Sequence, residues 1–87
     1  MGEVIVVEHA YKHGLSFEQI EYAWNHPVRK QYRGAPQEGQ ILLIGLDREG
    51  RFIELIAAEH SYGTVIYHAI EPPTRAVLIE LEMLRRN

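Results

Sequence analysis

Three side chains in the C-terminal half are of the types that transfer protons or hold a phosphate: Glu54, His68 and Arg75. Glu54 interrupts the apolar segment 52–58, where a carboxylate must be paired or lie on a partly wet face. It can be a general acid or base, or form an ordinary salt bridge to Arg51, Arg75 or a lysine. His68 can shuttle protons or be a core histidine bonded to a backbone carbonyl. Arg75 can hold a phosphate or make a surface ion pair.

A second group of candidate residues lies near the N-terminus. His9 and His13 are four residues apart, a spacing that puts two imidazoles on one face of a helix and can bind a metal ion. No third ligand is identifiable, and the other interpretation is that one histidine packs against the sheet while the other is solvated. The chain has no cysteine and none of the common nucleotide-binding or zinc-protease motifs. We therefore expect neither a metal ion nor a cofactor.

The composition indicates one ordinary globular domain over residues 1–87. Hydrophobic residues make up 46% of the chain and charged residues 24%. The longest apolar run, 41–46, is far below the roughly 20 residues that cross a bilayer, and the N-terminus does not have the pattern of a signal peptide. We expect a cytoplasmic protein that makes no use of a membrane.

The charge gives only limited support for nucleic-acid binding. The net charge is −3 with histidine neutral, whereas a nucleic-acid binder usually carries a basic face. The basic residues gather in two short clusters, for which the simplest interpretation is a solvated face: Arg29, Lys30 and Arg33, and then Arg85 and Arg86.

Strands are predicted where short apolar or β-branched segments lie between turn signals. We expect them at 3–7, 28–33, 40–46, 51–59 and 64–70, with four-residue turns at 47–50 and 60–63. The segment 40–46 is almost continuously apolar, which is typical of a strand buried on both faces. Consecutive strands joined by short turns predict an antiparallel β-meander.

Helices are predicted before and after this meander. One or two turns are expected over 8–13, and Ser16 with Gln19 has the capping-box pattern that opens a helix ending near Asn25. Thr74 can cap a last helix over 75–86. The fold class is therefore α+β, with helices covering one face of the sheet. The last helix has a main apolar stripe (Val77, Leu78, Leu81, Leu84) and a second apolar patch (Ala76, Ile79, Met83), and this patch can face a partner.

Three segments resemble a known family. The segment from Lys12 to Glu18, KHGLSFE, looks like the K-H-G-[hydrophobic]-S-F-E segment of BrnT-type toxins. Ile44-Gly45-Leu46 with Gly50-Arg51 resembles their strand-turn-strand, and His68-Ala69-Ile70 with Thr74-Arg75 resembles their S-A-R…T-R segment. The resemblance spans about residues 8–80. The chain differs in having His68 in place of serine and Ile70 in place of arginine.

The resemblance implies a RelE-like fold, metal-independent ribonuclease activity and a small antitoxin partner. Our first hypothesis is a BrnT-like, toxin-related protein that cleaves or binds RNA. His68 and Glu54 would transfer protons, Arg75 and Lys12 would contact phosphate, and His13 would lie nearby. The alternative hypothesis is a non-catalytic interaction module that acts as a homodimer or with a protein partner.

Overall fold

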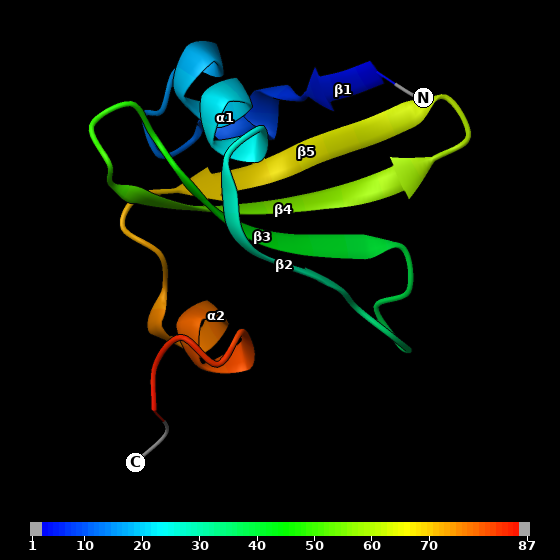
Figure 1. Cartoon of the computed structure of the whole chain (residues 1–87). Helices are drawn as coiled ribbons and strands as arrows, with labels where there is room; N and C mark the ends of the chain where they lie inside the picture. Colours follow the sequence, from blue (N-terminus) through cyan, green and yellow to red (C-terminus); the bar gives the residue numbers. More distant parts are fainter. Residues whose placement is uncertain (1–2, 86–87) are drawn as a thin grey trace.

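A mixed five-stranded sheet forms the centre of the computed structural model, which describes residues 3–85 (Figure 1). The order of strands across the sheet is β1-β5-β4-β3-β2. Two α-helices and a short 3-10 helix, η1, complete the α+β fold. Along the chain the elements are β1 (Glu3–Val6), η1 (Glu8–Tyr11), α1 (Phe17–Trp24), β2 (Pro27–Tyr32), β3 (Gln40–Leu46), β4 (Phe52–His60), β5 (Gly63–Ile70) and α2 (Arg75–Glu80).

The predicted meander accounts for four of the five strands. β2, β3, β4 and β5 pair antiparallel with their neighbours in chain order, with turns where the sequence indicates them. The sheet is nevertheless mixed, because β1 pairs in parallel with β5. The connection through η1 and α1 carries the chain from one edge of the sheet to the other, which leaves β1 beside the last strand (Figure 1).

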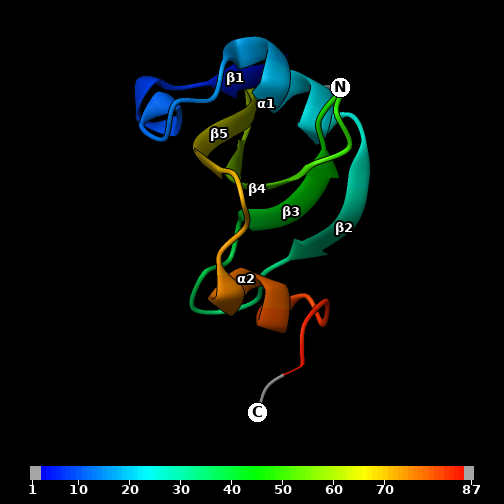
Figure 2. The ribbon, with the colours of Figure 1, turned by 90° about the vertical axis from the view of Figure 1, so that its left-hand side faces the viewer.

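The helices lie on both faces of the sheet, and the expectation that they cover one face is wrong. α1 packs on one face and α2 lies on the other (Figure 2). β3 is buried on both faces, as its apolar run predicts: Ile41 and Leu43 join the cluster under α1, while Leu42 and Ile44 join the cluster under α2. The two faces of the sheet therefore carry two separate apolar clusters.

α1 begins as the capping-box pattern predicts. The Ser16 hydroxyl accepts a bond from the Gln19 amide at 3.1 Å, and the Gln19 side chain accepts one from the Ser16 amide at 2.9 Å. The far end of α1 lies so close to β3 that a Cβ on Gly45 would overlap with the backbone of Ala23. Gly45 therefore sets how closely α1 approaches the sheet.

α2 is capped by Thr74 as expected but ends at Glu80, well before the predicted end at residue 86, which lies outside the described residues. Glu82 has a φ of 60°, the left-handed conformation, and its amide bonds the carbonyl of Ile79 at 3.0 Å. The Met83 amide bonds the carbonyl of Leu78 at 2.8 Å. These two bonds form a Schellman motif, which ends the helix without a glycine. No helix within residues 3–85 is long and apolar enough to cross a membrane.

Candidate functional site

An irregularity in β5 determines which residues share a face with His68. Ala57 pairs with Ile66 while the preceding Ile56 pairs with His68, so Tyr67 is an extra residue in the ladder, a β-bulge. Ile66 is buried in the cluster under α1, whereas Ile56 packs against the cluster under α2. Simple alternation puts Ile66 and His68 on one face, and the bulge makes this expectation wrong. His68 instead faces α2.

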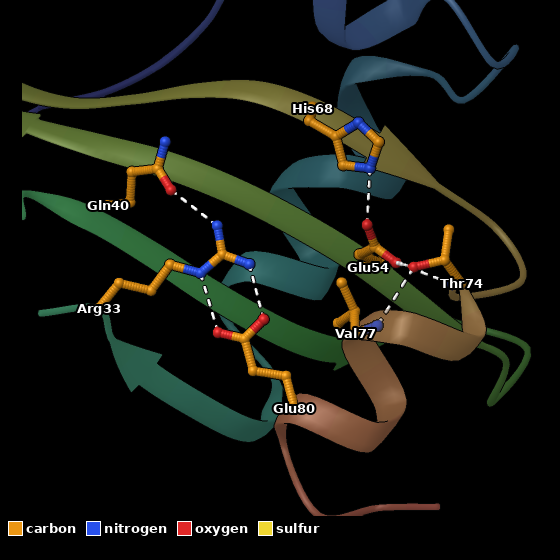
Figure 3. Close-up of polar contacts among 7 residues, drawn as sticks. All are labelled: Arg33, Gln40, Glu54, His68, Thr74, Val77 and Glu80. Carbon is orange, nitrogen blue, oxygen red and sulfur yellow. Dashed lines mark hydrogen bonds and ion pairs between the residues drawn. The ribbon is translucent and has the colours of Figure 1, made fainter. Parts of the chain in front are cut away.

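Glu54 connects His68 to the start of α2 (Figure 3). Its Oε2 lies 2.7 Å from Nε2 of His68. Its Oε1 accepts bonds from the amide and from the hydroxyl of Thr74, at 2.8 and 2.7 Å. The same hydroxyl caps α2 by accepting a bond from the Val77 amide at 3.4 Å. One carboxylate thus holds a histidine with one oxygen and a helix N-terminus with the other.

The burial of this pair defines the chemistry open to each partner. The Glu54 side chain is only 2% exposed, whereas that of His68 is 24% exposed. A carboxylate can only accept hydrogen bonds, so Oε2 of an ionised Glu54 accepts from a protonated Nε2 of His68. That assignment leaves Nδ1 of His68 as an unprotonated acceptor when the imidazole is neutral. His68 is therefore the member of the pair that can exchange a proton with a bound molecule.

His13 lies beside this pair, as the sequence hypothesis requires. The ring centroids of His13 and His68 are 5.9 Å apart and the rings are nearly perpendicular. Lys12 precedes His13 directly and is exposed. η1 contacts β5, and the turn that follows η1 carries both residues. The imidazole of His68, which is bonded to Glu54, and the exposed imidazole of His13 therefore lie next to each other beside β5.

Arg75 is the least constrained of the predicted residues. It is the first residue of α2, directly after Thr74, and its side chain is exposed. Within residues 3–85 the side chain of Arg75 makes neither a hydrogen bond nor an ion pair with another residue by the usual distance criteria. Its position beside the Glu54 network is set by sequence adjacency to Thr74.

A second polar cluster on the same face contains an arginine that sequence analysis did not assign to the site. Arg33 pairs with Glu80 of α2 through two bonds, at 3.0 and 2.7 Å, and donates to Gln40 at 2.7 Å (Figure 3). The bond from Arg33 holds the pKa of Glu80 below its usual value, and the pKa of Arg33 is raised in return. Burial raises the pKa of the nearby Tyr67 hydroxyl. Strand alternation through β2 places Arg29 and Arg33 on one face, and this signal could have identified them.

The structure changes the basis of the metal hypothesis. η1 ends at Tyr11, so His13 lies beyond the helix and the two histidines do not share a helical face. Within residues 3–85, no group of three or more histidine, aspartate, glutamate or cysteine side chains is arranged to hold a metal ion. Both His9 and His13 are exposed.

Comparisons of this chain with protein-family models, with curated protein sequences and with solved structures find no match. The function must therefore be argued from the residues of the site and from the resemblance of its motifs.

Proposed function

We propose that the chain is a BrnT-like, toxin-related protein with a RelE-like fold, which cleaves RNA without a metal ion. The observation that carries the proposal is the arrangement of two imidazoles. His68 is anchored by the buried carboxylate of Glu54, and the ring of His13 lies 5.9 Å from that of His68. Metal-independent cleavage of RNA requires one group that accepts a proton and one that donates a proton near the same phosphate.

In the proposed reaction, Nδ1 of neutral His68 removes the proton from the ribose 2′-hydroxyl as its oxygen attacks the adjacent phosphorus. The bond from phosphorus to the 5′-oxygen breaks, and protonated His13 donates a proton to that oxygen. The products are a 2′,3′-cyclic phosphate and a 5′-hydroxyl. Glu54 acts through His68: it fixes the tautomer of the imidazole and stabilises the imidazolium that forms.

Cations near the two histidines would stabilise the charge that develops on the phosphate. Lys12 adjoins His13 in sequence, and Arg75 adjoins Thr74, which bonds Glu54. Both side chains are exposed, so both can reach a bound phosphate. The proposal includes cytoplasmic RNA as the substrate and a small antitoxin protein as the partner that controls the activity, as the resemblance implies.

The alternative function is a non-catalytic interaction module that works as a homodimer or with a protein partner. The observation that favours it is the pair of hydrogen bonds that Oε1 of Glu54 accepts from Thr74. This contact fixes the start of α2 and would be useful in a chain that performs no chemistry. The partly exposed Ile79 and the exposed Leu84 extend the apolar surface of this C-terminal segment.

The test is cleavage of a short RNA by the purified protein in the presence of a chelator. We expect a 2′,3′-cyclic phosphate product and a rate that falls roughly 10²- to 10⁴-fold in His68→Ala and in His13→Ala. His60→Ala is the matched control, because His60 is an exposed histidine at the far end of β4, stacked on Tyr62. Expression of the wild type should slow bacterial growth, and His68→Ala should relieve this effect.

An RNA that stays intact with wild-type protein would overturn the proposal. The interaction module would then replace it, and sedimentation at several concentrations would show whether the chain forms a homodimer. Equal loss of activity in His60→Ala and His68→Ala would also count against the assigned roles.

A further inference from the structure

The segment from residue 22 to residue 37 contains no acidic residue, although the chain as a whole carries a net charge of −3. It includes the end of α1 and all of β2, and it holds three of the nine basic residues. β2 is an edge strand, and nearly all of its residues are exposed. The segment is therefore an open, locally basic edge of an acidic protein.

The register of β2 divides its basic residues between the two faces of the sheet. Arg29 pairs with Ile44 and donates to the carbonyl of Leu81 at 2.9 Å, so it serves the α2 face. Lys30 pairs with Leu43, which belongs to the cluster under α1. Lys30 is thus the basic residue of β2 that faces the α1 side.

On the α1 side, Lys30 lies close to two aromatic rings. Its Nζ is 5.3 Å from the ring centre of Trp24 and 5.4 Å from that of Tyr32. Tyr32 is 59% exposed, and Lys30 has no carboxylate partner within residues 3–85. Contacts of an exposed cation with aromatic rings are weak and easily exchanged for another partner. An incoming molecule could therefore stack on a ring and form an ion pair with the Lys30 ammonium group, and little interaction energy would be lost.

We propose that Trp24, Lys30 and Tyr32, here called the aromatic–lysine surface, bind single-stranded RNA. One or two bases stack on the rings, and Lys30 pairs with a backbone phosphate. Flat aromatic groups next to a cation are the combination by which single-stranded nucleic acid is held without sequence preference, and the segment 22–37 that carries them contains no acidic residue. An acidic peptide would use the charge of Lys30 but not the exposed face of Tyr32.

This inference rests on the proposed function for its choice of RNA as the ligand, and it assigns a separate role. The aromatic–lysine surface lies on the α1 side at the β2 edge, whereas His68 faces α2 on β5. Nucleotides on this surface are therefore outside the cleavage site. Loss of the surface should raise the KM for RNA cleavage and leave kcat unchanged, because the groups around the scissile phosphate are untouched.

Trp24 is the sole tryptophan of the chain, so its fluorescence reports on this surface directly. The probe is a short oligoadenylate with 2′-O-methyl groups, which lacks the 2′-hydroxyl needed for cleavage. We expect quenching of Trp24 on titration with the wild-type protein. Tyr32→Ala should weaken binding roughly 5- to 150-fold, the range for loss of one stacked base. Tyr62→Ala is the matched control, because Tyr62 is 62% exposed at the distant β4–β5 turn.

Lys30 gives a second, independent measurement. Lys30→Gln should reduce the slope of log Kd against log salt concentration by about 0.7, the value for one phosphate contact on a single strand. Lys30→Arg should retain the slope. A substitution that merely disturbed folding would not change the salt dependence by one phosphate, and melting curves of each variant check the fold.

The outcomes separate this inference from the proposed function. If RNA is cleaved but Trp24 is not quenched, or Tyr32→Ala binds as tightly as Tyr62→Ala, the aromatic–lysine surface is refuted and the ribonuclease stands. If Trp24 is quenched and no RNA is cleaved, the surface stands and the ribonuclease fails. If oligoglutamate quenches Trp24 and the oligoadenylate does not, the surface binds an acidic protein partner, and the RNA inference is overturned.

Discussion

Replacement of Glu54 by glutamine keeps the shape of the side chain and removes its charge. The new amide oxygen can still accept both bonds from Thr74, which Oε1 of Glu54 now accepts at 2.8 and 2.7 Å. The amide nitrogen then faces Nε2 of His68, and it can only donate. His68 must therefore place its proton on Nδ1, where the proposed reaction needs an acceptor. Glu54→Gln should impair catalysis more than it impairs folding.

The stability cost follows from the three hydrogen bonds. Bonds to a charged group are worth roughly 1 kcal/mol more than neutral ones, so the loss of charge weakens the set by about 3 kcal/mol. A neutral amide is less costly to bury than a carboxylate that is 2% exposed, which offsets part of this loss. We expect a net cost of about 1–2 kcal/mol for Glu54→Gln. Glu54→Ala removes every acceptor and should cost about 3–5 kcal/mol.

For a domain of this size these values correspond to a fall in Tm of roughly 4–16 °C for Glu54→Gln and more than about 12 °C for Glu54→Ala. Hydrogen exchange provides the local measurement. The amides of Val77 and Leu78 bond the hydroxyl and the carbonyl of Thr74, and that of Leu81 bonds the carbonyl of Val77. These three amides should exchange faster in Glu54→Ala than in the wild type. The amides of α1 should be affected less, because α1 lies on the other face of the sheet.

Glu59→Gln is the control, because Glu59 lies on the same strand and is exposed. It should change the free energy of unfolding by no more than about 0.5 kcal/mol. For catalysis, Glu54→Gln should lower kcat roughly 10²-fold or more at every pH where the protein is folded. The reasoning is refuted if Glu54→Ala melts like Glu59→Gln and the amides of α2 keep their protection.

Three further predictions concern the elements around the site. Gly45→Ala should destabilise the protein by about 1–3 kcal/mol, measured by urea unfolding, because a Cβ there meets the backbone of Ala23. Glu82→Gly should raise Tm by a few degrees, since a non-glycine residue in the left-handed conformation costs roughly 1–2 kcal/mol, although a more flexible unfolded chain returns part of this gain. Glu80→Gln should cost about 0.5–1 kcal/mol at pH 7 through the loss of its pair with Arg33. The pKa of Glu80 is lowered in the folded state, so this stability is present above pH 4.5 and the difference should vanish as pH falls below that value.

Local signals in the sequence predicted most of the elements. The capping box at Ser16, the turn over 47–50 and the apolar run of β3 each specify a structure through neighbouring residues alone, and each is confirmed. The end of α2 could not be predicted in this way. Apolar residues continue at helical spacing past Glu80, but the chain ends the helix with Glu82 in a conformation that usually requires glycine.

The site was predicted in part, and the missing parts depend on non-local pairing. Glu54 and His68 are identifiable from the sequence as polar residues in apolar strands, and the structure brings them into contact. Alternation alone could not reveal the bulge at Tyr67. The extra residue is defined only by the pairing of β5 with β4, in which Ile56 and Ala57 are adjacent but their partners His68 and Ile66 are not. The sequence places Arg33 in a short basic cluster, and no neighbouring residue in the sequence indicates its ion pair with the distant Glu80.

The two oxygens of Glu54 allow the catalytic and structural explanations to be separated. Oε1 alone bonds Thr74, and Oε2 alone bonds His68. Thr74→Ala should therefore loosen α2 and leave most of the activity, while His68→Ala should lower activity roughly 10²- to 10⁴-fold and leave α2 docked. If both substitutions release α2 to the same extent, the histidine is part of the docking contact, and the interaction module explains the site better than the ribonuclease.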